Sequence, residues 1–513
     1  MRKRWKRILV VVILLAPVWF LIFEHFRGQY LLASYKKELA RKGQTLDIKQ
    51  LLSPRSAAEN NGLPEFLRLT ALLPKTSAVV DNYPPKMKLI SPGKAVVSLR
   101  LDSWIEEGMH NKLTTNTWAP IEKDLEANQT TLENLRNTLT KPVFQSSNGF
   151  LNGFEVSGLY TELVPAKQAA QWFSTATQNS IRQGNFEGAL DNLISGLNAD
   201  RVLEKDGVAI TELVHIAISY INFNASWEAL QTNTWTDSQL SRLQLAWENT
   251  PFAKNMALSL QRERAAEHSY YYPLFKKSTQ QMHRHLYNGG MGDDDTPNRA
   301  RQFMEEQVLS RIWRFAWMDQ DSAFSLREMQ KLIDQNAPGA AANDNDPLSY
   351  GIMMNAISPS KASAGKNFYN KLRYAMSGNS VTNLSSLPAK AARAETQKSL
   401  VITAIALMRY QHRNGKPPQT INDLSPDFVK SIPLDYMDGK PIRYKLNADG
   451  TWTIYSVGAN GTDEHGDASP LKPNSSYRSI WDGKDAVWPS PATSEEFLDF
   501  QNKSYKSKST KKD

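Results

Sequence analysis

The chain has 513 residues, a formal net charge of +9 and no cysteine. This length predicts two to four structural units. The absence of cysteine excludes disulfides, thiolate zinc sites, iron–sulfur clusters and cysteine nucleophiles. Residues 1–7 contribute +5 and residues 502–513 contribute +4, so the body between them carries no net charge. A broad nucleic-acid-binding surface therefore has no support, and we expect no nucleic acid partner.

A basic leader, residues 1–7, precedes an apolar segment, residues 8–26, that is predicted to anchor the chain in a membrane. Residues 8–23 contain no charged side chain, and roughly twenty helical residues cross the hydrocarbon core. The positive-inside rule places the leader in the cytoplasm. The alternative, a cleaved signal peptide, requires a small-x-small site, which residues 24–28 (EHFRG) do not supply. We therefore expect a single-pass protein of a bacterial cytoplasmic (inner) membrane whose bulk is periplasmic.

The anchor is followed by a predicted juxtamembrane helix, residues 27–54, and a mostly helical body, residues 55–390. In the body, residues 184–190 (GNFEGAL) join two segments whose apolar residues recur with helical spacing. This join resembles the bend of a tetratricopeptide hairpin, where glycine allows two antiparallel helices to turn tightly. No second copy follows at a fixed period, so the pattern favours an ordinary pair of helices.

The periodicity changes near the carboxy terminus, where residues 391–475 are predicted to form a small α+β domain. A long helix comes first, and Ile442, Tyr444 and Leu446 then alternate with basic residues before an Asn-Ala-Asp-Gly turn. This alternation is typical of a β-hairpin. Residues 476–513 are expected to be a tail, disordered from about residue 502. The predicted fold class is mainly α, with a small C-terminal α+β domain and an N-terminal transmembrane helix.

Three motifs in this unit occur in a recognisable order: residues 410–418 (YQHRNGKPP), residues 433–439 (PLDYMDG) and, after the hairpin, residues 455–461 (YSVGANG). The order resembles the globular domain of the major pseudopilin of type II secretion. The resemblance implies a fold, but it does not extend to the pseudopilin leader. No glycine directly precedes the apolar run, and its first glutamate is Glu24. Processing and pilus assembly by that route are therefore not expected.

In that family the loop after the hairpin binds calcium through oxygen ligands. The resemblance implies that the corresponding candidate ligands for Ca2+ are Ser456, Asn460, Asp463 and Asp467. Calcium requires six to eight oxygen ligands, and a loop of Ser, Asn and Asp can supply several of them. Asn460 replaces an aspartate of the family pattern, and a paired acid near Asp467 is missing. The alternative is a polar turn that binds no metal.

The layout of the whole chain also resembles a group of uncharacterised bacterial single-pass membrane-anchored proteins. The match lies in residues 35–43 (YKKELARKG), residues 184–190 and residues 262–265 (RERA). This resemblance implies an architecture of anchor, helical body and C-terminal unit. It implies no particular activity.

Motifs that carry catalysis are absent from the sequence: it contains no HExxH, GxSxG or GxxxxGK[ST]. His283, His285 and the acidic run of residues 293–295 are more typical of exposed loops than of metal sites. We therefore favour a non-enzymatic interaction or scaffold protein of the envelope, with a protein partner that the sequence does not identify. The alternative is a periplasmic hydrolase that uses Asp/Glu or His chemistry in a pocket of the helical body.

Overall fold

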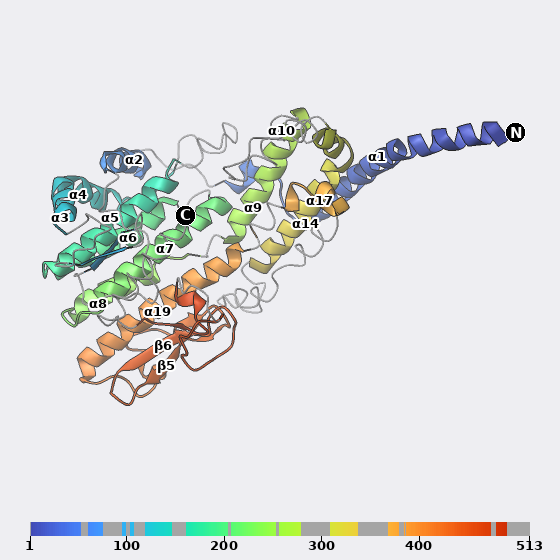
Figure 1. Ribbon diagram of the computed structural model, residues 1–513. Coiled ribbons are helices and arrows are strands. Elements are labelled where there is room, and N and C mark those ends of the chain that lie inside the picture. Colours follow the sequence, from blue (N-terminus) through green and yellow to red (C-terminus); the bar gives the residue numbers. More distant parts are fainter. Residues whose placement is uncertain are drawn as a thin grey trace, which may run out of the picture.

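The computed structural model describes residues 2–52, 60–74, 95–98, 103–106, 118–145, 161–203, 207–252, 256–278, 308–336, 368–378, 384, 386–472 and 479–489. The fold is mainly helical with a small sheet near the carboxy terminus, as the sequence predicts. Figure 1 shows the helices gathered into one body, with the sheet at one end and the N-terminal helix projecting from the other. His283, His285, residues 293–295 and residues 490–513 of the predicted tail lie outside the described residues. Residues 479–489, which were also predicted to belong to the tail, instead contain a turn of 3-10 helix (Ile480–Asp482) and a strand (Ala486–Val487) that pairs with the C-terminal sheet.

Helix α1 (Arg2–Arg41) joins the predicted leader, anchor and much of the juxtamembrane helix into one continuous helix. Its N-terminal half points away from the body in Figure 1. The predicted anchor includes residues 8–14, whose side chains lie outside the described part. Among the described residues, no helix is long and apolar enough to cross a membrane.

The second half of α1 packs in parallel against α14 (Met318–Asn336). Leu32 and Leu39 share an apolar cluster with Leu326. Gly28 allows the two helices to approach closely, because a Cβ atom there would lie 3.0 Å from Cγ of Gln320. The start of the body is therefore attached firmly along one face of α1.

The centre of the body is a layer of long helices. The predicted helical pair is confirmed as α5 (Leu163–Arg182) and α6 (Phe186–Asn198), which pack against each other. Gly184 adopts a φ of +73° at their bend, and the side chain of Asn185 caps α6 by accepting a hydrogen bond from the backbone N–H of Gly188. Helix α7 (Ala209–Ala229) packs on α5, and α8 (Asp237–Glu248) packs on α6.

Shorter elements surround this layer. The helices are α2 (Leu63–Leu72), α3 (Trp118–Ala127), α4 (Gln129–Thr138), α9 (Met256–Ala266), α10 (Tyr272–Lys277), α13 (Ser310–Ile312) and α17 (Phe368–Arg373). Single turns of 3-10 helix are η1 (Ile48–Leu51), η5 (Ala199–Leu203), η9 (Ile421–Leu424) and η10 (Ile480–Asp482), and π-helical turns are η6 (Glu267–Tyr271) and η8 (Trp313–Trp317). Strands β1 (Ala95–Ser98) and β2 (Ser103–Glu106) form an antiparallel pair.

The C-terminal unit consists of helix α19 (Leu387–Asn414) and short antiparallel strands. The predicted hairpin is confirmed as β5 (Arg443–Leu446) and β6 (Trp452–Ser456), and β6 also pairs with β7 (Ala486–Val487). A second small pair joins β3 (Leu434–Asp435) and β4 (Lys440–Pro441). In Figure 1, α19 lies between the helical layer and the strands.

The C-terminal unit shares its core with the body. Helix α19 contacts α7 and α8 on one side and β3 and β6 on the other. The indole N–H of Trp227 on α7 donates a hydrogen bond of 2.8 Å to the carbonyl of Pro489. The rings of Phe223 and Trp488 meet edge to face. One continuous hydrophobic core therefore extends from the helical layer into the sheet.

Arg264 of α9 connects three parts of the chain from a fully buried position. Its guanidinium donates hydrogen bonds to the side chain of Gln330 on α14, to Oε1 of Gln44 at 3.1 Å and to the carbonyl of Thr45 at 3.2 Å. Burial lowers its pKa to about 10, so the group still carries its charge at neutral pH. Arg264 thus joins α9 and α14 to the segment that follows α1.

We expect Arg264→Met to lower the free energy of unfolding by about 2–4 kcal/mol, because one buried and two partly buried acceptors lose a charged donor. Urea denaturation of the full chain in detergent measures the change. The matched control is Arg242→Met, which removes an exposed ion pair with Glu187 and should cost at most about 1 kcal/mol. Equal losses in the two variants would contradict the structural role of Arg264.

Candidate functional site

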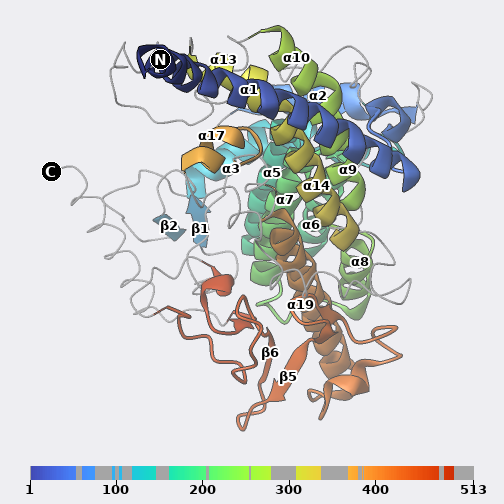
Figure 2. The same ribbon diagram turned by 90° about the vertical axis from the view of Figure 1, so that its right-hand side faces the viewer.

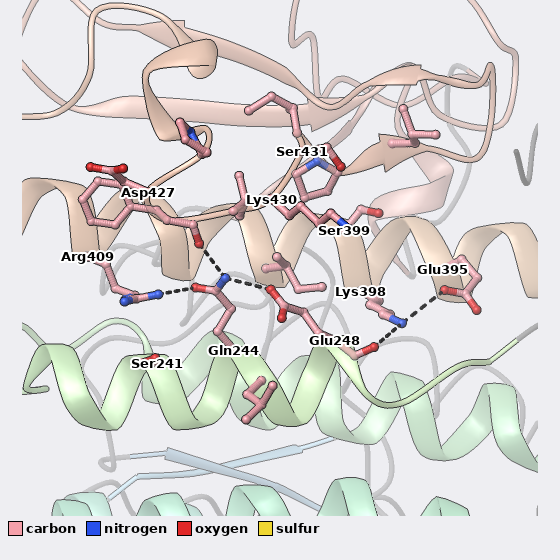
Figure 3. A pocket seen from close by; sticks show the side chains of 18 of the residues that line it. Ser241, Gln244, Glu248, Glu395, Lys398, Ser399, Arg409, Asp427, Lys430 and Ser431 are labelled. Atoms are coloured by element: carbon pink, nitrogen blue, oxygen red, sulfur yellow. Dashed lines mark hydrogen bonds and ion pairs between the residues drawn. The ribbon is translucent and has the colours of Figure 1, made fainter. Parts of the chain in front are cut away.

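A groove of about 660 Å³ lies where α8 faces α19 and the loop of residues 426–434. Figure 3 shows the side chains of both helices and of the loop pointing into it. The groove forms because α8 belongs to the helical layer, whereas the loop belongs to the C-terminal unit. The lining side chains that carry charge are Glu248, Glu395, Lys398, Arg409, Asp427 and Lys430.

Gln244 of α8 connects the walls of the groove. Its side-chain amide donates hydrogen bonds to the carbonyl of Phe428 at 2.7 Å and to Oε1 of Glu248 at 2.8 Å. Its carbonyl oxygen accepts one from Nη1 of Arg409 on α19 at 3.1 Å. Arg409 also bonds Asp237 at 2.9 Å and lies over the ring of Phe428. The hydrogen bonds of Gln244, drawn in Figure 3, hold the loop against both helices.

The other end of the groove is closed by Lys398 of α19. Its ammonium donates hydrogen bonds to the carbonyls of Glu248 at 3.3 Å and Thr250 at 3.0 Å, where α8 ends. A cation at this position favours the helix because the carboxy end of a helix carries partial negative charge. The carboxylate of Glu395 lies 3.9 Å away and accepts a hydrogen bond from the backbone N–H of Phe252. Lys398 and Glu395 therefore hold the groove in shape.

The groove combines balanced charge with exposed apolar surface. Its charged lining residues are three acids and three bases, so it carries no net charge. Leu245 on α8 is 57% exposed at its edge, and Ile402 of α19 lines it from the other side. No histidine is among the described residues that line it. The groove thus presents polar, charged and apolar side chains together.

A histidine–carboxylate cluster lies elsewhere, between η5, α7 and α9. Nδ1 of His215 lies 2.7 Å from Oδ1 of Asp200, and the hydroxyl of Ser259 donates a hydrogen bond to Glu212. Burial raises the pKa of Glu212, partly opposed by the nearby His215. All four residues are buried, with at most 4% of their surface exposed. A substrate does not reach these groups in this conformation, so the cluster acts as a polar part of the core.

The first two of the four predicted calcium ligands, Ser456 and Asn460, form hydrogen bonds within the loop region. The hydroxyl of Ser456 donates a hydrogen bond to Asp435 at 2.9 Å and accepts one from the backbone N–H of Gly458. The side-chain oxygen of Asn460 accepts from the backbone N–H of Thr462 at 3.0 Å. Both side chains thus stabilise the turn after β6.

The other two predicted ligands are carboxylates that meet donors of the protein. Oδ1 of Asp463 accepts from the hydroxyl of Tyr455 at 3.1 Å and from the backbone N–H of His465 at 3.0 Å. Oδ2 of Asp467 accepts from the ammonium of Lys484 at 2.6 Å. Over the part of the chain that the structure describes, no group of three or more His, Asp or Glu side chains is arranged to hold a metal. The calcium site stays a prediction.

Thermal melting of the full chain with calcium and with a chelator distinguishes a calcium site from a loop that is held by hydrogen bonds of the protein itself. A calcium site predicts a higher melting temperature in calcium, and Asp463→Asn would remove the increase. A loop held by its own donors predicts the same melting temperature in both solutions. In that case Asp463→Asn lowers the melting temperature equally with and without calcium.

Two buried carboxylates that position these loops were not predicted. Asp435 accepts hydrogen bonds from the backbone N–H groups of Met437 and Val457, both at 3.0 Å or less, and pairs with Arg443. Burial raises its pKa. Asp485 accepts from the backbone N–H of Gly466 at 2.7 Å. The aspartate in the PLDYMDG motif was a visible signal for the first, whereas nothing in the local sequence marked the second.

Comparison with known proteins identifies no relative of this chain. No family model, no curated protein and no solved structure matches the chain. The function of this chain is therefore inferred from its sequence and from the described contacts.

The ion pair of Asp467 predicts a specific pH dependence. The hydrogen bond from Lys484 and the backbone N–H of Ser469 lower the pKa of Asp467 to about 2. A lowered pKa stabilises the fold above the unfolded value of about 4, and this stabilisation is lost as the pH falls from about 4 toward 2. We expect Lys484→Met to melt below wild type at neutral pH and to approach it as the pH falls through this range.

The control for this experiment is Lys445→Met, which removes an exposed lysine from strand β5 of the same sheet. Its difference from wild type should not change between pH 7 and the acid range. Thermal unfolding followed by circular dichroism gives both differences. A difference for Lys484→Met that is independent of pH would contradict the ion pair.

Proposed function

We propose that this chain is a membrane-anchored protein of the bacterial envelope that binds a protein partner and does not catalyse a reaction. The groove between α8, α19 and the loop of residues 426–434 is the observation that carries the proposal. We place the bulk of the chain in the periplasm and the leader, residues 1–7, in the cytoplasm.

The anchor is supported by the apolar run and by the exposure of its described part. Trp19 is 67% exposed and Phe23 is 62% exposed, on a helix that projects from the body. Exposing large apolar side chains to water raises the free energy by about 25 cal/mol for each Å². A lipid environment removes this cost. The five basic residues before the run supply the orientation.

We propose that the groove binds an extended segment of a periplasmic protein. Balanced charge argues against nucleic acid, which requires an excess of cations. Exposed Leu245 offers an apolar contact, and the charged side chains around it offer partners for a segment of mixed charge. Contacts of this kind are typical of interfaces that form between separately folded proteins.

The alternative, a periplasmic hydrolase, would use the buried cluster of Asp200, Glu212, His215 and Ser259. That cluster would need an opening that admits a substrate, and its side chains are enclosed. Hydrolysis by the purified full chain that Asp200→Asn abolishes, with the fold retained, would favour the hydrolase over the binding protein.

The binding proposal predicts where a photo-crosslinker captures the partner. We expect benzoylphenylalanine at Leu245 to give one discrete adduct in native membranes. Lys430→Glu, at the edge of the groove, should reduce its yield several-fold, because it reverses a charge that the partner meets. The control position is Val164, 68% exposed on α5 outside the groove, which should give no such adduct. The same adduct from both positions would contradict a specific groove.

The topology predicts an asymmetry in chemical labelling, which the absence of native cysteine makes simple to measure. A membrane-impermeant maleimide should label Leu245→Cys in cells whose outer membrane has been permeabilised. It should label Lys3→Cys only after the inner membrane is broken. Labelling of Lys3→Cys in unbroken cells would contradict the proposed orientation.

A further inference from the structure

We infer that the end of the body beside α1 rests on the lipid surface, so that the body is docked on the membrane and not only tethered to it. The membrane-facing surface consists of α10, α13, η8 and α17. This inference depends on the proposed anchor, because it takes α1 to enter a bilayer.

The body first contacts α1 at the level where the predicted anchor ends. The carboxylate of Glu24 accepts a hydrogen bond from the side chain of Gln320 at 2.8 Å and one from the hydroxyl of Tyr369 at 2.9 Å. Glu24 lies only about 3 Å along the helix from Phe26, the last residue of the anchor, because the rise is 1.5 Å per residue. The surrounding elements of the body therefore lie at the depth of the lipid headgroups.

The exposed apolar stripe of α1 continues past this point. Phe26 and Tyr30 are both exposed, while Glu24 and Gly28 face the body. Aromatic side chains are favoured at the membrane interface, where their rings meet both apolar and polar surroundings. The apolar surface of the anchor thus continues along the part of α1 that contacts the body.

The four elements of the membrane-facing surface are held together and fixed to α1. Phe275, Trp313 and Met376 form a small apolar cluster separate from the main core, and Leu21 of α1 packs against it. Nδ1 of His25 lies 2.7 Å from the carbonyl of Phe315, and the two rings stack with centroids 4.7 Å apart. Figures 1 and 2 both show α10 and α17 near the part of α1 that enters the body.

These four elements carry six basic residues and no acidic residue. The exposed members are Lys276, Lys277, Arg311 and Lys371. Phe315, 48% exposed on η8, adds an apolar group next to α1. Residues 8–502 as a whole carry no net charge, so this concentration of positive charge is local.

An anionic lipid surface matches this chemistry better than a second copy of the chain. Lysine and arginine are attracted to anionic headgroups, and aromatic side chains insert at the same depth. Two copies joined through this surface would instead bring like charges together. The occupant is therefore a bilayer that contains anionic phospholipid.

A single-cysteine probe tests the inference on the full chain, which has no native cysteine. The chain is reconstituted in phosphatidylcholine vesicles with phosphatidylglycerol as a minor component and a spin label on the headgroups. We expect a fluorophore on Arg311→Cys to be quenched several-fold more strongly than one on Leu245→Cys, which lies in the groove. Equal quenching at the two positions would overturn the docked arrangement.

A charge-reversal pair provides the matched comparison. Lys276→Glu with Lys277→Glu, added to the Arg311→Cys probe, should reduce quenching several-fold. Lys416→Glu with Lys445→Glu, exposed in the C-terminal unit, should leave it unchanged. If the fluorescence of the probe at position 311 changes with the protein-to-lipid ratio but not with the headgroup label, the surface binds a second copy of the chain and the inference is overturned.

Flotation of the same vesicles separates this inference from the proposed function. A full chain that does not float with the vesicles contradicts the anchor itself. A chain that floats, with the probe at position 311 unquenched, contradicts only the docking of the body.

Discussion

The burial of α19 on opposite sides is the constraint on which the rest of the structure depends. The helix contacts α7 and α8 with one side and the C-terminal strands with the other. From Leu387 to Met408 most of its side chains are buried. Because a helix that is buried all round cannot stand alone in water, neither the helical layer nor the sheet is complete without it. The groove exists because α8 and the loop of residues 426–434 both approach the same helix.

This constraint bears on the resemblance to pseudopilins, which stays a prediction. The motifs that carry it lie in α19, the β3–β4 turn and the loop after β6. Here the helix is covered by α7 and α8, and Trp227 ties the end of the unit to the body through Pro489. A surface covered in this way is not available to neighbouring copies. In this fold the C-terminal unit forms one wall of the groove.

Local patterns predicted the elements, whereas long-range contacts determined the site. The sequence predicted a long helix before the hairpin, but not that this helix is buried on opposite sides. The boundary predicted between residues 390 and 391 consequently falls inside this helix. Gln244 meets Phe428 across 184 residues of sequence, and no local pattern contains that information. The partner of Asp467 in the loop after the hairpin, Lys484, lies seventeen residues further on.

The two ends of the body differ in charge. The groove, with balanced charge, lies between α8 and α19, and Figure 1 places both at the end of the body remote from the N terminus. The basic elements α10, α13, η8 and α17 lie at the end beside α1. Between the two ends, Arg264 joins α9 and α14 to the segment after α1, and α9 in turn contacts α7. Because these links are packed helices and not a flexible linker, anchoring α1 in a membrane also sets the direction in which the groove faces. A groove held in this way keeps one orientation relative to α1, whereas the same groove on a flexible tether would have no fixed orientation.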